Sequence, residues 1–66
     1  MAGKFEIYQE NSGQYRFRLK AGNGEIIATG EAYATKAGAK SGCEAVMQAA
    51  PGATIQEVVR GEIQEA

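Results

Sequence analysis

The sequence predicts an α+β domain in which three strands are followed by one helix and a last strand, in the order β-β-β-α-β. Apolar and polar residues alternate in the N-terminal third, as they do in antiparallel strands with one buried face. Residues 35–50 change to helical spacing, and residues 54–59 form a short apolar segment after it. Because a chain of 66 residues forms one small unit, we treat residues 1–66 as a single domain.

The first hairpin is predicted from two alternating segments, "KFEIYQ" and "QYRFRLK", with "NSG" at residues 11–13 between them. A three-residue hairpin loop needs a positive φ at its last position, which glycine adopts readily. Closing this loop with Glu10 opposite Gln14 places Ile7 opposite Phe17, so that apolar side chains of both strands share one face.

The second hairpin is predicted from "NG" at residues 23–24, the strongest short hairpin signal in the chain. A two-residue loop, with Gly22 paired to Glu25, and a four-residue loop, with Lys20 paired to Glu25, are both open. Either loop places Ile26 on the apolar face of the sheet.

Residues 35–50 predict a helix that Thr35 caps and Pro51 ends. Residues of one face form an apolar stripe: Ala39, Cys43, Val46 and Ala50. Beside it lies a nearly smooth flank: Gly38, Gly42, Ala45 and Ala49. Each helical glycine costs about 1 kcal/mol relative to alanine, and close packing against the sheet can offset that cost. Glu44 and Gln48 lie on the opposite side, which we expect to face solvent.

Residues 54–59, "TIQEVV", predict the last strand. Ile55 and Val59 share one face and Val58 lies on the other, which suggests that both faces are covered near the strand end. Residues 60–66 have only a weak pattern, and three arrangements are open: a flexible tail, an extension of the strand through Ile63, or local docking of Ile63.

The composition limits how such a small domain can be stabilised. The chain has one cysteine, Cys43, and no histidine, so neither an intrachain disulfide nor a zinc site is expected. Because small domains are marginally stable alone, oligomerisation is the remaining means of stabilisation. We expect no signal peptide and no membrane helix, since the N-terminus lacks an apolar region and no apolar segment is long enough. These features predict a cytoplasmic protein.

Three cations on alternate positions, Arg16, Arg18 and Lys20, are the candidate contacts for a nucleic acid or another polyanion. The net charge of −1 excludes a domain that is basic overall, so only such a local patch is left. The predicted register places Glu6 opposite Arg18, which neutralises part of the charge. We therefore favour the interpretation that these cations are the solvated face of a sheet.

Other chemical signals are weak. "AGAKSG" and "GNGEII" each lack glycines that the phosphate-binding and dinucleotide-binding motifs require. Cys43 has no histidine partner and lies in the apolar stripe, so we expect a buried side chain rather than a nucleophile. Glu25 and Glu31 flank the third strand and are expected to be solvated. The sequence predicts no catalytic, cofactor-binding or metal-binding residue and no cofactor.

Several segments together resemble the YegP-like family of small bacterial and archaeal proteins. They are "KFEIY", Gly13, "YRFRLKA", "NGEII", Tyr33 and "GAKSGCEAV", and the resemblance extends from residue 3 to about residue 59. The family usually has serine where Gly30 stands and an aliphatic residue where Cys43 stands.

The resemblance implies a β(3)-α-β unit that pairs with a second unit, in the same chain or in another, by exchanging C-terminal strands. A single unit then implies a homodimer. The family has no assigned activity, catalytic residue or cofactor, so the resemblance implies a non-enzymatic module of unknown function. The alternatives are weak polyanion binding through Arg16, Arg18 and Lys20, and an enzyme with a small-molecule site at the dimer interface.

Overall fold

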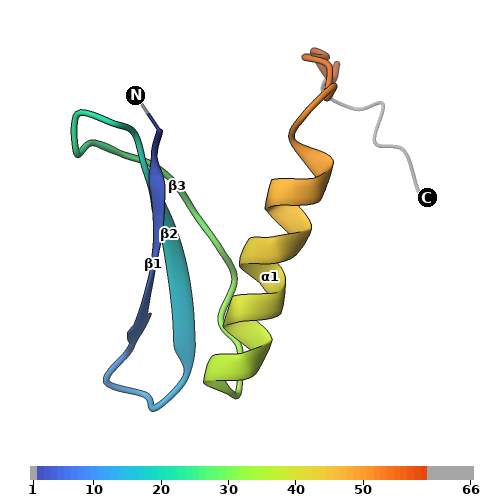
Figure 1. The fold of residues 1–66 in the computed structure, drawn as a ribbon. Coiled ribbons are helices and arrows are strands. Elements are labelled where there is room, and N and C mark those ends of the chain that lie inside the picture. The colour runs from blue at the N-terminus through green and yellow to red at the C-terminus, as the bar shows by residue number, and fades with distance from the viewer. Residues whose placement is uncertain (1, 60–66) are drawn as a thin grey trace.

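The computed structural model describes residues 2–59 and contains three strands and one helix (Figure 1). The elements are β1 (Lys4–Gln9), β2 (Tyr15–Lys20), β3 (Ile26–Thr29) and α1 (Lys36–Ala49). The strands form one antiparallel sheet in the order β1-β2-β3, and α1 lies against one face of it. The predicted α+β class and the first four elements are therefore confirmed.

The first hairpin has the predicted loop and register. The Glu10 N–H donates to the Gln14 carbonyl at 2.8 Å, and Gly13 ends the loop with a φ of 94°. Ile7 pairs with Phe17. The alternation of β1 and β2 therefore places their apolar side chains toward α1.

The second hairpin differs from both predicted loops. The Ala21 N–H donates to the Glu25 carbonyl at 2.8 Å, which leaves a three-residue loop ending in Gly24 at a φ of 91°. A three-residue loop needs a positive φ at its last position, and Gly24 supplies it there, as Gly13 does in the first hairpin. Lys20 then pairs with Ile26, so Ile26 lies opposite Lys20 and not on the apolar face where both predicted loops placed it. Leu19 pairs with Ala28, and a β-bulge takes up the extra residue.

The chain continues along β2 after β3 ends. The Gly30 N–H donates to the Phe17 carbonyl at 2.9 Å, and Tyr33 exchanges two backbone hydrogen bonds of 2.7 Å with Tyr15. This bridge fixes Tyr33 beside β2 just before the helix begins.

Helix α1 begins and ends where predicted. The Thr35 hydroxyl accepts a hydrogen bond from the Gly38 N–H at 2.9 Å, and the helix ends before Pro51. In the predicted apolar stripe, only the N-terminal half is covered. Ala39 and Cys43 are buried, whereas Val46 and Ala50 are exposed.

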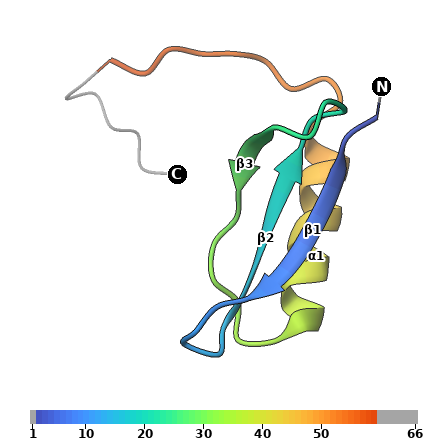
Figure 2. The ribbon, with the colours of Figure 1, turned by 90° about the vertical axis from the view of Figure 1, so that its left-hand side faces the viewer.

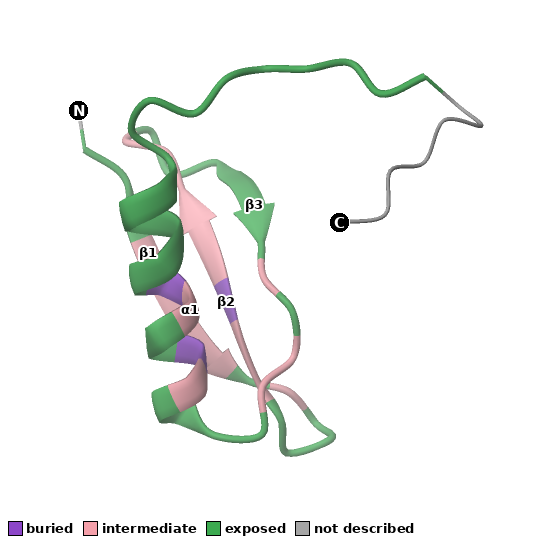
Figure 3. Cartoon of the chain, turned by 90° about the vertical axis from the view of Figure 1, so that its right-hand side faces the viewer, coloured by how far each residue is buried: buried purple, intermediate pink, exposed green. Residues whose placement is uncertain are grey.

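The core lies between β2 and the N-terminal half of α1 (Figure 3). Its buried residues are Phe17, Ala39 and Cys43. The Phe17 ring meets Phe5 edge-on at a centroid distance of 5.7 Å and stacks on Tyr33 at 6.2 Å. Glycine in α1 makes this approach possible, because a Cβ on Gly42 would lie 3.1 Å from the Phe17 ring and 2.8 Å from Tyr33 Cζ.

Residues 54–59, predicted as the last strand, do not form a strand in this single chain. They continue beyond α1 as an extended, exposed segment that pairs with no strand of the described sheet (Figure 2). A strand needs a neighbour for its backbone hydrogen bonds, and the segment has none within its own described fold. That it pairs with a second chain stays a prediction. Residues 60–66, for which three arrangements were open, lie outside the described residues.

We expect Gly42→Leu to destabilise the fold by about 1–3 kcal/mol, although leucine has the better helix propensity. The added side chain would collide with Tyr33 and the Phe17 ring, which are held by the bridge to β2 and by the core. Urea unfolding followed by circular dichroism measures the change.

Gln48→Leu is the matched control, because it adds leucine to the exposed side of the same helix. Its unfolding midpoint is expected to stay close to that of the unchanged chain. A Gly42→Leu variant as stable as the control would show that α1 does not pack tightly at this position.

Candidate functional site

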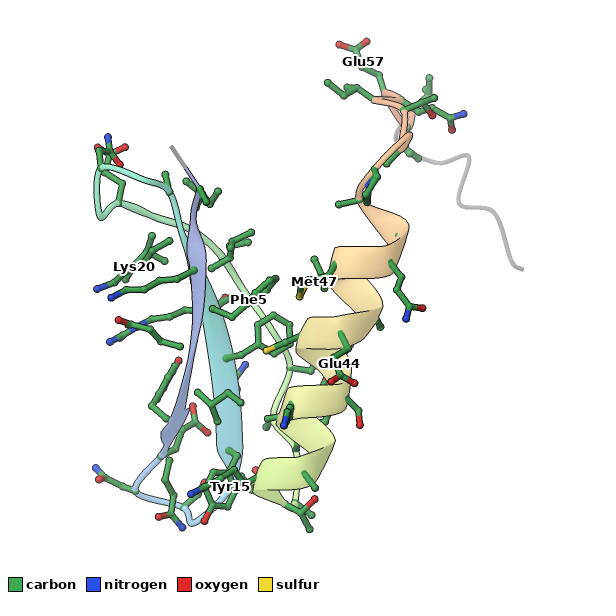
Figure 4. All side chains as sticks on the ribbon, viewed as in Figure 1. Phe5, Tyr15, Lys20, Glu44, Met47 and Glu57 are labelled. Atoms are coloured by element: carbon green, nitrogen blue, oxygen red, sulfur yellow. The ribbon has the colours of Figure 1, made fainter. Side chains whose placement is uncertain are left out.

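The face of the sheet turned away from α1 carries the candidate polyanion contacts. Arg16, Arg18 and Lys20 occupy alternate positions of β2 and share this face. Figure 4 shows Lys20 extending from the sheet on the side opposite the helix. The structure therefore brings the three predicted cations together, as period-two alternation requires.

Arg16 is bound within its own chain. Its Nε donates to the Glu10 carboxylate at 2.7 Å, and its Nη1 donates to the Gly30 carbonyl at 2.7 Å. The hydrogen bond and the negative charge of Glu10 raise the pKa of the Arg16 guanidinium above its ordinary value. Arg16 thus joins the first hairpin to the segment that follows β3.

Arg18 and Lys20 both contact Glu6. The Arg18 Nε donates to Glu6 Oε1 at 2.8 Å, and Lys20 Nζ lies 3.4 Å from the same oxygen. Arg18 also lies over the Tyr8 ring, 5.1 Å from its centroid. The hydrogen bond from Arg18, together with the nearby Lys20, lowers the pKa of Glu6 below its ordinary value.

These contacts favour a structural role for the two arginines. A guanidinium that already binds a carboxylate must give up that partner, or share it, before it binds a phosphate backbone. The predicted Glu6–Arg18 pairing is present, and Glu10 neutralises Arg16 in addition. The described geometry therefore supports the solvated-face interpretation over polyanion binding through the two arginines.

The other chemical candidates do not come together as a reactive site. Cys43 is buried, and burial raises the pKa of its thiol, which disfavours the nucleophilic thiolate. Glu25 and Glu31 are exposed at opposite ends of β3. Among residues 2–59, no group of three or more His, Cys, Asp or Glu side chains could hold a metal ion.

An exposed apolar surface is the feature that the sequence did not predict. Helix α1 packs on β1 and β2 but not on β3, so all four residues of β3 are exposed (Figure 3). Ile26 is 54% exposed and Ile27 is 59% exposed. In the sequence, only Ile27 indicated this surface, because the alternation of the strand places this aliphatic residue on the same side as the polar residues.

A second apolar surface lies between the sheet and the C-terminal half of α1. There Phe5 of β1 and Met47 of α1 extend toward each other (Figure 4). They border a groove of about 520 Å³. Its lining residues are Gly3, Phe5, Leu19, Val46, Met47, Ala50 and Pro51. The groove continues the predicted apolar stripe of the helix where nothing in the described chain covers it.

No helix within residues 2–59 has the length and apolar character needed to cross a membrane.

Comparison with protein families gives a match over most of the chain. The family described as "Domain of unknown function (DUF1508)" matches residues 10–57. The matched range contains β2, β3 and α1 and most of the extended segment that follows the helix.

Similar proteins occur in bacteria and archaea. A UPF0339 protein of Treponema denticola is 64% identical over 88% of this chain and 100% of the relative. A UPF0339 protein of Methanosarcina acetivorans is 46% identical over 79% of this chain and 90% of the relative. UPF0339 protein YegP of Shigella flexneri is 49% identical over 77% of this chain, which spans only 46% of that relative.

The fold also resembles a structure solved in solution by NMR, that of a protein from Haloferax volcanii. The TM-score is 0.76 at 42% sequence identity, and the match covers 85% of this chain and 95% of the other.

We expect the double substitution Arg16→Ala and Arg18→Ala to leave the fold intact and to lower the melting temperature only modestly. The two side chains are partly exposed, and ion pairs of this kind contribute little to stability. Circular dichroism during heating measures the effect. If the unchanged chain bound oligonucleotides tightly at physiological salt, and the double variant did not, the structural role would be wrong.

Acidification is expected to remove the stabilisation that Glu6 provides. Its pKa is lower in the folded chain than its ordinary value of 4.5, because Arg18 and Lys20 favour the carboxylate. This stabilisation is present above the ordinary pKa and is lost as the pH falls through the lowered value. Glu6→Gln should therefore lose less stability than the unchanged chain as the pH falls below the ordinary carboxyl pKa of 4.5.

Urea unfolding at a series of pH values tests this expectation. Glu44→Gln is the control, since Glu44 is exposed on α1 away from the cations. Parallel losses of stability in both variants and the unchanged chain would contradict the role given to Glu6.

Proposed function

This chain belongs to the DUF1508 family, and we propose that within it the protein is a non-enzymatic, self-associating module. Residues 54–59 of each copy complete the sheet of the other copy. The relatives compared above carry names that state no activity. The proposal therefore depends on the surfaces of this chain, and the cytoplasmic location expected from its sequence is part of it.

The exposed segment at residues 54–59 is the observation that carries the proposal. Ile55 is 99% exposed, Val58 is 70% exposed and Val59 is 60% exposed. Burial of these three large aliphatic side chains would stabilise the protein, and exposure to water forgoes that stabilisation. An extended conformation with apolar side chains on both faces is the form that a strand takes before it adds to a sheet.

The sheet offers a matching edge. β3 is an edge strand, with Ile26 and Ile27 exposed and no helix over it. Figures 2 and 3 both show the C-terminal segment leaving α1 on the β3 side of the molecule. An open apolar edge of this kind is a ready template for pairing with another chain.

The small core gives a second reason for association. Three residues within the described part of the chain are buried, and the groove beside Phe5 and Met47 is open. A domain of this size buries a small share of its surface when alone, and a second copy increases that share. Pairing of residues 54–59 with the β3 edge would also bring apolar side chains near Ile26 and Ile27.

The lengths of the relatives agree with the proposal. The Treponema denticola relative has the extent of a single unit of this kind. YegP of Shigella flexneri matches this chain over 46% of its length, which leaves room for a second unit of similar size in one polypeptide. A second unit could then take the place that a second copy has here.

We expect the chain to be a dimer at micromolar concentration and Ile55→Glu to disrupt that dimer. In the single chain Ile55 is almost fully exposed, so the substitution should be harmless unless a partner covers it. Light scattering coupled to size exclusion measures the mass. Gln56→Glu introduces the same side chain at the next position and is expected to leave the dimer intact.

Deletion of residues from 54 onward is expected to unfold the protein rather than to give a folded monomer. Circular dichroism reports the loss of structure. A folded monomer, from either the full chain or the deletion, would mean that the segment is dispensable or pairs within its own chain. An Ile55→Glu variant with the mass and stability of the Gln56→Glu control would also contradict the proposal.

A further inference from the structure

One end of the solvent-facing side of the sheet holds more positive charge than its carboxylate neutralises. Arg18 and Lys20 contact Glu6 Oε1, and Lys4 Nζ lies 3.7 Å from Glu6 Oε2. Three cations thus share one carboxylate, which leaves an excess of two positive charges around Glu6. Arg18 makes the shortest of these contacts, so the excess is concentrated at the two lysines.

Lys4 and Lys20 lie directly opposite each other on β1 and β2. Residues paired in this way project from the same face, and like charges opposite each other destabilise a sheet. Glu6 reduces this repulsion only in part. An anion bound between the two ammonium groups would remove it.

A hollow of about 430 Å³ lies beside the two lysines. Its lining residues are Ala2, Lys4, Lys20, Ala21, Gly22, Asn23 and Gly24. This volume is within the range of small-molecule sites in proteins. Gly3, between the lining residues Ala2 and Lys4, passes close to β2, where a Cβ would collide with the Lys20 carbonyl oxygen. That approach sets the N-terminal end of β1 beside the second hairpin loop.

The loop supplies further donors. Its own hydrogen bonds use the N–H groups of Ala21, Gly24 and Glu25. Among the hydrogen bonds within residues 2–59, none uses the N–H of Gly22 or of Asn23. Two lysines and the two loop residues whose N–H groups those bonds leave unused therefore line the hollow, and its lining contains no carboxylate.

We infer that this hollow binds a dianionic phosphate group, either free or carried by a small monoester. Two excess positive charges match the two negative charges that a phosphate monoester approaches at neutral pH. Ammonium and backbone N–H groups are the donors that bind phosphate oxygens in proteins. The inference uses Lys4 and the second hairpin loop, and it does not depend on the proposed self-association.

The experiment is a titration of the full, ¹⁵N-labelled chain followed by NMR. Inorganic phosphate and glycerol 3-phosphate are the two probes, and sodium chloride keeps the ionic strength constant. We expect saturable shifts of the amide signals of Lys4 and of residues 20–24 with at least one probe. The tighter probe then distinguishes free phosphate from a monoester as the ligand.

Lysine substitutions distinguish a specific phosphate site from general attraction of phosphate to a positively charged surface. Lys20→Gln should weaken binding about tenfold, because it removes a charged hydrogen-bond donor. Lys4→Gln should act likewise, and it cannot unfold the chain by loss of packing, because the Lys4 side chain is 71% exposed. Lys40→Gln, on the exposed side of α1, removes the same charge elsewhere and should leave binding unchanged.

Shifts that do not saturate with either probe would overturn the inference. Equal weakening of binding by Lys4→Gln and Lys40→Gln would overturn it as well, since the net charge alone would then explain the shifts. Binding by Lys4→Gln that equals binding by the unchanged chain would also contradict it. Glu6→Gln gives an independent check. It removes the carboxylate that competes for the two lysines, so tighter binding supports the site and weaker binding contradicts it.

Discussion

The packing of the Phe17 ring determines where the helix can lie. Phe17 lies in the middle of β2, and its buried ring packs edge-on against Phe5 and stacks on Tyr33. Gly42 in α1 and Gly30 after β3 have no side chain where a Cβ would meet this ring. The aromatic ring occupies the space left by both glycines, and this close approach offsets the helix propensity that Gly42 lacks.

The same approach explains what the fold leaves uncovered. The N-terminal half of α1 packs tightly on Phe17, and the C-terminal half of the helix diverges from the sheet. This divergence leaves Phe5 and Met47 beside an open groove (Figure 4). The helix covers β1 and β2 and does not reach β3. The two apolar surfaces of this chain thus follow from where α1 packs tightly, and one of them, on β3, lies on the side toward which the C-terminal segment extends.

Local patterns predicted what local interactions determine. The register of the first hairpin follows from alternation and from Gly13, and the start of α1 follows from the hydroxyl of Thr35. The second loop was missed because its length depends on a β-bulge that pairing with β2 selects. The bridge from Tyr33 to Tyr15 and the charge cluster around Glu6 each consist of residues from different segments, so neither can be predicted from the pattern of one segment. The segment at 54–59 has strand composition, but a strand also requires a neighbour, and the described sheet of this chain does not pair with the segment.

The exposed segment after α1 also bears on how long an unpaired copy survives. Proteases bind their substrates as extended chain, and residues 54–59 have that form without any unfolding. Cleavage there depends on the population of open chain, which would fall if the segment were held in a sheet as proposed. If residues 54–59 pair with a second copy as proposed, turnover in the cell would act first on chains that have not found a partner, and cleavage at the segment would leave those chains unfolded and open to complete degradation.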